Sequence, residues 1–364
     1  MQAVVDGSAY YNTIQQTMEA NCSADMHAAV TYADEILRSG TADEISLLKR
    51  AIFLTYSVNP GKNNSFNSFP APTSPDDLTD WAIASILTHT LQGSIVAFQT
   101  FGYAKALLPF CNDLETWNLA NFTGFTPSSP TTSLTDNSGD GIPTPEGISA
   151  SSSPELAFYA YLYATTRKMA SDYIFLPNPY FSPSDRMAWT WQLCSEFGQF
   201  QTTQAHSSPA TNIVTGHYSV EGTLISFCHG PFPYAPAAPD IAAGVGKYGS
   251  WGMRPSNVMF TNGEIDPLRS ISVQADKGIN PAALDRKSTQ TVPPCGVPPP
   301  GNEVFGVVYK GAVHASDLAF AASGPAPVEK GRELFESALD VWLECFGKEK
   351  EGVYEAAASN ALAR

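Results

Sequence analysis

The chain has 364 residues, of which 43% are hydrophobic and 15% charged, so it can bury a sizeable core and is not a disordered protein. Its net charge of −15 disfavours nucleic acid and anionic membranes as partners. The acidity suits an acidic extracellular, vacuolar or lysosomal setting, and it is equally compatible with a generic acidic soluble protein.

The first part of the chain predicts helices. Residues 23–40 place apolar side chains at helical spacing and end at a glycine, which suits a helix C-terminus. Residues 41–54 open with a capping-box pattern, in which Thr41 and Glu44 can satisfy each other's backbone donors. Two further helices are expected between residues 76 and 110.

The composition changes near residue 175. Before it, segment 123–154 is dominated by Ser, Thr, Pro and Gly and predicts a long surface loop. Pro154 then starts a predicted helix with an aromatic stripe that we expect in the core. We therefore expect a mainly helical cap domain over residues 1–174 and the C-terminal part of an α/β sheet over residues 175–364.

Two short apolar runs near the C-terminus, in NVMFTNGEIDPLRS and VVYKGAVHASDL, predict buried strands that run into loops. The first loop presents Asp266 and the second His314. An Asp followed later by a His is the order of the Ser-Asp-His triad in α/β hydrolases. We expect Asp266 to orient the imidazole and His314 to act as general base and then general acid. The alternatives are a turn aspartate before proline and a structural histidine.

The segment between these two loops is rich in proline and glycine, so we expect it to be a surface excursion. The last predicted element is an amphipathic helix over residues 328–347, stopped by a glycine. The chain shows no internal repeat.

The nucleophile of such a triad is not found in the chain. A nucleophile elbow needs the motif G-x-S-x-G, because small flanking residues permit its strained turn, and no serine lies in that motif. Ser219 and Ser250 lie near glycines, but at the wrong spacing. Cys194 could be proposed as a thiol nucleophile, although a disulfide or core cysteine is the stronger interpretation. The other histidines match no metal-ligand spacing, so we expect neither a metal nor a cofactor.

The cysteines and glycosylation motifs favour the secretory route. Six cysteines without a C-x-x-C pair indicate disulfides rather than a zinc site, with the pairing left open. N-x-[ST] motifs occur at Asn21, Asn63 and Asn121. The first residues, however, lack the basic and apolar regions of a signal peptide, and no apolar run is long enough to span a membrane. We therefore expect the natural N-terminus to be missing.

Four stretches resemble the serine peptidase family of lysosomal prolyl carboxypeptidase and dipeptidyl peptidase II, including its fungal extracellular members. They are WTWQLCSEFGQFQT, NVMFTNGEIDPLRS, GAVHASDL, and the opening MQAVVDGSAYYNTI followed by NCS. The resemblance implies an α/β-hydrolase sheet with a large, mainly helical cap. It implies cleavage of peptides or proteins next to proline, usually near a chain end and often at acidic pH.

The resemblance also assigns site residues. It identifies Asp266 and His314 as triad members and places the nucleophile serine shortly before Met1. Leu268 stands where the family usually has a tryptophan lining the proline pocket, so the substrate preference is left open.

Two residues of the block WTWQLCSEFGQFQT, Trp191 and Glu196, are further candidates for substrate binding.

Two hypotheses follow for the function. In the first, the chain is part of a proline-directed serine peptidase, inactive without its serine, and the choice among carboxypeptidase, dipeptidyl peptidase and endopeptidase is open. In the second, the chain is a non-catalytic secreted protein whose cap binds peptides or a partner. A homodimer is compatible with both.

Overall fold

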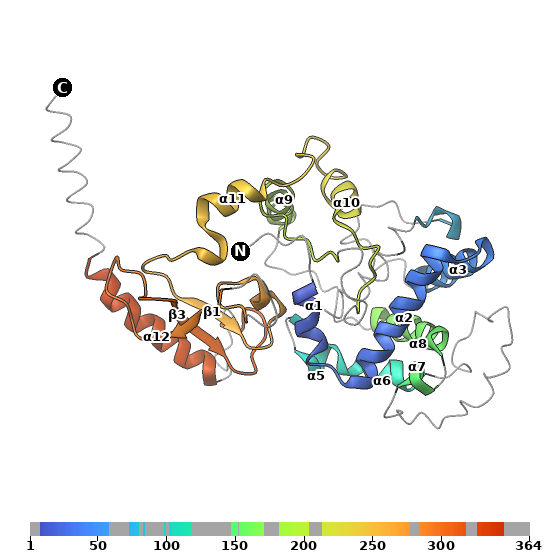
Figure 1. The fold of residues 1–364 in the computed structure, drawn as a ribbon, viewed down its shortest axis with the longest axis horizontal. Helices are drawn as coiled ribbons and strands as arrows, with labels where there is room; N and C mark the ends of the chain where they lie inside the picture. Colours follow the sequence, from blue (N-terminus) through green and yellow to red (C-terminus); the bar gives the residue numbers. More distant parts are fainter. Residues whose placement is uncertain are drawn as a thin grey trace. The chain divides into compact units, whose positions relative to one another are not determined.

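The computed structural model describes residues 8–57, 73–79, 83, 98–99, 102–117, 147–151, 153–170, 182–203, 213–276, 284–317 and 326–345 (Figure 1). The chain divides into two compact units. We call Gln2–Val245 the N-terminal unit and Gly246–Arg364 the C-terminal unit. This division falls well after residue 174, where the change in composition placed the end of a cap, and the assignment of a cap domain stays a prediction.

The described part of the N-terminal unit is helical. The longer helices are α1 (Ser8–Gln15), α2 (Ala20–Ser39), α3 (Ala42–Ser57), α6 (Leu108–Glu115), α8 (Pro154–Ala170) and α9 (Pro183–Gln192). The short helical segments are η2 (Pro75–Asp77), α5 (Tyr103–Ala106), α7 (Ile148–Ser151), η4 (Leu193–Phe197), α10 (Val220–Thr223) and η6 (Leu224–Cys228). The exposed helix α11 (Ile241–Tyr248) contains the residues at which the chain is divided.

The local signals at the helix ends act as the sequence predicts. Helix α2 ends before Gly40, whose backbone N–H donates to the carbonyl of Ile36. Helix α3 begins with the expected capping box: the Thr41 backbone N–H donates to Glu44 Oε2 at 2.7 Å, and the Glu44 N–H donates to Thr41 Oγ1 at 3.3 Å. Helix α8 begins at Pro154, where the missing N–H costs no helical hydrogen bond.

The core of the N-terminal unit lies around α8, which packs against α2 and α6. The aromatic stripe of α8 is buried as predicted, and Phe110 meets Tyr161 edge to face with ring centroids 5.8 Å apart. A disulfide between Cys22 and Cys111 joins α2 to α6 beside this core. The disulfide therefore links the two helices that both pack against α8.

Hydrogen bonds from α2 and a second disulfide stabilise the later part of this unit. Asp34 on α2 accepts hydrogen bonds from Thr215 Oγ1 at 2.5 Å and from the backbone N–H of Gly216 at 2.9 Å. A second disulfide, Cys194–Cys228, joins η4 to η6 inside a small apolar cluster. This pairing confirms the interpretation of Cys194 as a disulfide cysteine and leaves no free thiol there.

The predicted long loop over residues 123–154 is only partly described. Its last residues contain the short helix α7 and the start of α8, so the predicted loop extends too far toward the C-terminus. Residues 118–146 lie outside the described residues, as do most of the residues between 76 and 110 for which two helices were expected.

The C-terminal unit is built on a small parallel sheet (Figure 1). Its elements are η7 (Ser250–Gly252), β1 (Phe260–Gly263), η8 (Pro267–Ile271), β2 (Lys287–Thr289), β3 (Glu303–Tyr309) and α12 (Ala326–Leu343). The strand order is β1-β3-β2, and β3 pairs in parallel with both neighbours. Strand β3 arises from the second apolar run and buries most of its residues, as predicted. Strand β1 shares only Phe260 with the first run, and its first three residues are half-buried, so the prediction of a buried strand is wrong there in bounds and burial. The helix–sheet combination confirms an α/β arrangement at a coarse level.

Strand β2 corrects the prediction of a mere surface excursion between the two loops. It consists of Lys287, Ser288 and Thr289, and its residues are mostly exposed. Such a short polar strand at the edge of a sheet carries no apolar run, so the pattern that reveals buried strands cannot detect it.

Helix α12 packs against β3. Phe305 from the strand lies against Ala338 and Trp342 from the helix, with the two aromatic rings edge to face at 5.6 Å. The disulfide Cys295–Cys345 joins the proline-rich segment after β2 to the end of this helix. The proline-rich segment is thereby held beside the end of α12.

Among the residues that the structure describes, no helix is both long and apolar enough to cross a membrane. The same residues contain no group of three or more His, Cys, Asp or Glu side chains that could hold a metal ion.

Candidate active site

Asp266 lies just beyond the carboxyl end of β1, at the start of η8. Its side chain is buried, and its Oδ1 accepts a hydrogen bond from the backbone N–H of Leu268 at 2.9 Å. The Asp266 N–H in turn donates to the carbonyl of Gly263, the last residue of β1. The aspartate is thus the N-cap of a helical turn, a role that suits Asp and fixes the direction of its carboxylate.

His314 lies in the loop that follows β3, the strand paired with β1. Two backbone hydrogen bonds join the end of β3 and this loop to the aspartate loop: Glu264 N–H donates to Tyr309 O at 2.9 Å, and Ile265 N–H donates to Ala312 O at 3.1 Å. Parallel strands end at the same sheet edge, and loops from neighbouring strands therefore meet there. His314 is followed by Ala315, whose φ of 50° is left-handed.

The two loops bring the predicted pair together. His314 Nδ1 and Asp266 Oδ2 are 2.9 Å apart, and 40% of the His314 side chain remains exposed against 4% for Asp266. The hydrogen bond that His314 donates to Asp266 raises the pKa of His314 above its ordinary value of 6.5; burial opposes the shift, and the charges of Asp266 and Asp317 add to it. Because Nδ1 faces the carboxylate, Nε2 is the nitrogen left to exchange a proton with a reacting group.

Gly263 explains how the two loops approach so closely. A Cβ atom built there would lie 2.3 Å from Ala312 O and 2.4 Å from Val313 O, the two carbonyls before His314. Only a residue without a side chain lets the histidine loop cross the end of β1 at this distance.

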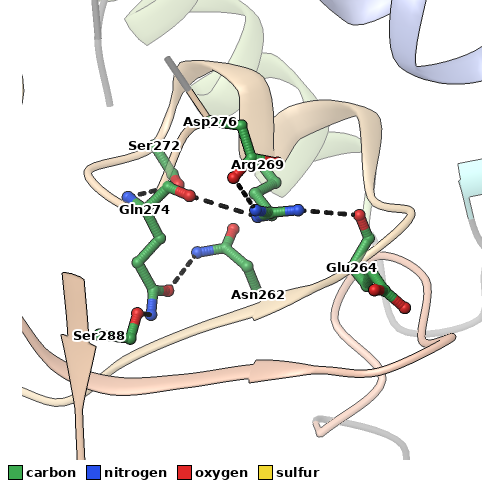
Figure 2. A network of polar contacts seen from close by, with 7 residues as sticks. All are labelled: Asn262, Glu264, Arg269, Ser272, Gln274, Asp276 and Ser288. Carbon is green, nitrogen blue, oxygen red and sulfur yellow. Dashed lines mark hydrogen bonds and ion pairs between the residues drawn. The ribbon is translucent and has the colours of Figure 1, made fainter. Parts of the chain in front are cut away.

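A network of polar contacts braces the aspartate loop, and Figure 2 shows it with Arg269 and Gln274 at its centre. Arg269 donates to the backbone carbonyls of Glu264 and Gln274 and forms an ion pair with Asp276. This network was not predictable from the sequence. Its one signal is an arginine close to Asp266, which by itself does not distinguish a bracing residue from a surface residue.

The other predicted site residues are distributed over both units. Leu268 is half-buried in η8, where its backbone N–H contacts Asp266. Trp191 and Glu196 belong to the N-terminal unit, so they are not placed relative to Asp266 and His314. Trp191 is 41% exposed and packs edge to face on Phe232 at 5.3 Å, and Glu196 is exposed on η4.

Of the glycosylation motifs, the first falls on α2. Asn21 is half-buried there, and Ser23, the third residue of its motif, is buried. Asn63 and Asn121 lie outside the described residues.

Comparisons with known proteins point to one family. Residues 155–288 match the family model described as Serine carboxypeptidase S28. This stretch contains Asp266 and ends before His314. The chain is also 30% identical over 159 residues to the thymus-specific serine protease of Mus musculus, an alignment that covers 43% of this chain and 26% of that protein. The chain thus spans about a quarter of the length of the curated relative it matches, and both findings support the S28 family.

Proposed function

We propose that this chain supplies the Asp and His of a Ser-Asp-His triad in a serine-type peptidase of the α/β-hydrolase kind. The observation that carries the proposal is the 2.9 Å hydrogen bond between Asp266 and His314, made at the carboxyl edge of a parallel sheet. The order of the two residues along the chain is that of α/β hydrolases, and the match to the S28 family supports the same chemistry.

In the proposed reaction His314 Nε2 takes the proton of the serine hydroxyl as the oxygen attacks the scissile carbonyl carbon. The same nitrogen then gives that proton to the leaving amine as the peptide C–N bond breaks. Asp266 keeps the neutral ring of His314 in the tautomer that is protonated at Nδ1, and it stabilises the imidazolium that exists between the two proton transfers. Since no G-x-S-x-G motif occurs in these 364 residues, the proposal places the serine in sequence that precedes them.

The proposed substrates are peptides or proteins with proline next to the scissile bond, cleaved near a chain end by a secreted or lysosomal enzyme. This part of the proposal rests on the sequence resemblance. In this proposal Trp191 and Glu196 contact the substrate, and Leu268 lines the substrate pocket beside Asp266.

The test uses the full-length protein and its His314→Gln variant. Peptides with proline on the acyl side of the scissile bond, matched proline-free peptides, and a fluorophosphonate probe for activated serines report on the reaction. We expect the variant to lose on the order of 10³-fold or more in kcat/KM while remaining folded. His229→Gln is the matched control, because the ring of that half-buried histidine contacts the carbonyl of Pro236 in the N-terminal unit, so the variant should stay active. Equal activity in His314→Gln would refute the triad.

The second candidate function, a non-catalytic peptide-binding homologue, is favoured by the missing G-x-S-x-G motif. The same experiment separates the two. A full-length protein that takes no fluorophosphonate yet binds proline-rich peptides supports the binding protein.

A further inference from the structure

Arg269, three residues after Asp266, makes three separate contacts with its planar guanidinium group (Figure 2). Its Nε donates to the carbonyl of Gln274 at 3.2 Å, its Nη1 donates to the carbonyl of Glu264 at 3.1 Å, and its Nη2 lies 2.5 Å from Asp276 Oδ1. The Arg269 side chain is 14% exposed, against 52% for Asp276. The contact with Gln274 is therefore the part-buried end of the site, whereas the contacts with Glu264 and Asp276 lie at the surface.

The two carbonyls that Arg269 holds lie on opposite sides of Asp266 in the chain. Glu264 comes directly after β1, and Gln274 comes after η8. One planar guanidinium group thus bridges the two ends of the loop that presents the carboxylate. A fork of fixed geometry restrains two chain positions at once, which a lysine with a single ammonium group does not.

Gln274 fastens the same loop to the sheet. Its side chain is buried, its Oε1 accepts from Asn262 Nδ2 on β1 at 2.6 Å, and its Nε2 donates to Ser288 Oγ on β2 at 2.8 Å. The loop clamped by Arg269 is therefore anchored to both edge strands of the described sheet.

Glu264 connects the loop held by Arg269 to the histidine loop. While its carbonyl binds Arg269, its N–H donates to Tyr309 O and its carboxylate accepts from the Gly311 N–H at 2.8 Å. Gly311 lies three residues before His314. Glu264, whose carbonyl binds Arg269, thus joins the loop of Asp266 to the loop of His314.

We propose that Arg269 is a positioning residue that clamps the 264–276 loop so that the Asp266 carboxylate is held against the His314 imidazole. Its catalytic consequence rests on the proposed peptidase function, whereas the clamp itself can be tested without activity.

The test follows the reaction of His314 with diethyl pyrocarbonate against pH in the full-length protein, quantified by peptide mapping. Only the neutral imidazole reacts, so the midpoint of the curve reports the pKa of His314. We expect Arg269→Gln to move the midpoint down from the wild-type value toward that of Asp266→Asn. Arg254→Gln is the matched control, since that arginine of the same unit donates to the carbonyl of Pro299, and its midpoint should not move. If Arg269→Gln fails to melt cooperatively, Arg269→Lys replaces it with the same expectation.

A second readout is the kinetics of the full-length enzyme. We expect kcat to fall on the order of 10- to 100-fold in Arg269→Gln with little change in KM, because loose positioning acts on the chemical step. An unchanged His314 midpoint in the folded Arg269 variant, with a lowered midpoint in Asp266→Asn, overturns the clamp and leaves the proposed triad standing. No shift in Asp266→Asn refutes the pair itself.

Discussion

At the scale of single residues, the hydrogen bond from His314 to Asp266 determines the direction in which the pKa of His314 is shifted. Because the pKa of His314 is raised above 6.5, the stability that the pair contributes is fully present below pH 6.5 and is lost as the pH rises through the folded-state pKa. Catalysis needs the neutral imidazole, so we expect kcat/KM of the full-length enzyme to climb at pH values above 6.5.

This expectation is opposed to the acidic optimum that the sequence resemblance implies. The measurement is a profile of kcat/KM from pH 4 to 9 with a proline-containing peptide. A plateau that extends unchanged down to pH 5 would show that the pKa of His314 is not raised in the working enzyme.

A second residue-scale prediction concerns Glu115 in the N-terminal unit. Its side chain is only 7% exposed, and burial, with the nearby carboxylates of Asp25 and Glu19, raises its pKa from 4.5 to about 8. The stability that the protonated form contributes is present below pH 4.5 and is lost as the pH rises toward 8. We expect Glu115→Gln to raise the Tm at pH 7.5 by about 5 °C or more and to change it little at pH 4.

The matched control is Glu35→Gln on α2, whose side chain is exposed and should leave both melting temperatures within about 1–2 °C. Equal effects of the two substitutions at pH 7.5 would contradict a buried, proton-bearing Glu115.

At the scale of elements, the approach of the histidine loop to β1 depends on Gly263. Its replacement by alanine places a Cβ against two backbone carbonyls that cannot move without shifting His314. We expect Gly263→Ala to destabilise the C-terminal unit by about 1–3 kcal/mol, as overpacking does, and to abolish the raised pKa of His314. Urea unfolding and the pyrocarbonate titration measure the two effects.

Gly244→Ala provides the control, because a Cβ at this position in helix α11 meets no atom within 4 Å. Alanine should stabilise that helix by up to about 1 kcal/mol. A Gly263→Ala variant as stable as this control would mean that the loops have room to separate.

The elements that could be predicted from the sequence are those whose signal is local. Residues 41–57 show a capping box followed by helical spacing, and β3 shows an apolar run between turn residues, so each was predicted with only small errors in its bounds. Strand β2 has three mostly exposed residues, and it exists only because β3 offers a free edge. A tertiary cause of this kind leaves no periodicity in the sequence.

The candidate site divides in the same way. Asp266 and His314 were predictable because their order and their strand-to-loop positions are features of the chain itself. Their bracing by Arg269 and Gln274 was not, since it consists of contacts with backbone carbonyls and with side chains of other strands. Those partners are set by the fold and can be any residue type.

At the scale of the whole molecule, a polypeptide of these 364 residues should be inactive. Without a nucleophile, loss of rate is on the order of 10⁶-fold, so neither peptide turnover nor fluorophosphonate labelling is expected from pure material. In the described sheet β1 is an edge strand, and an unpaired edge promotes aggregation. Size-exclusion chromatography that returned a monodisperse, active monomer would contradict both expectations.

The pairing of the six cysteines divides the chain into closed loops and open connections. The disulfides enclose residues 22–111, 194–228 and 295–345, and each begins and ends on the same side of the division at residue 245. None of these disulfides spans the segment between the second and third loops, so only the polypeptide backbone connects them covalently. One protease cut at residues 229–294 yields two separate bands on a non-reducing denaturing gel, whereas a cut inside a loop yields two bands only after reduction.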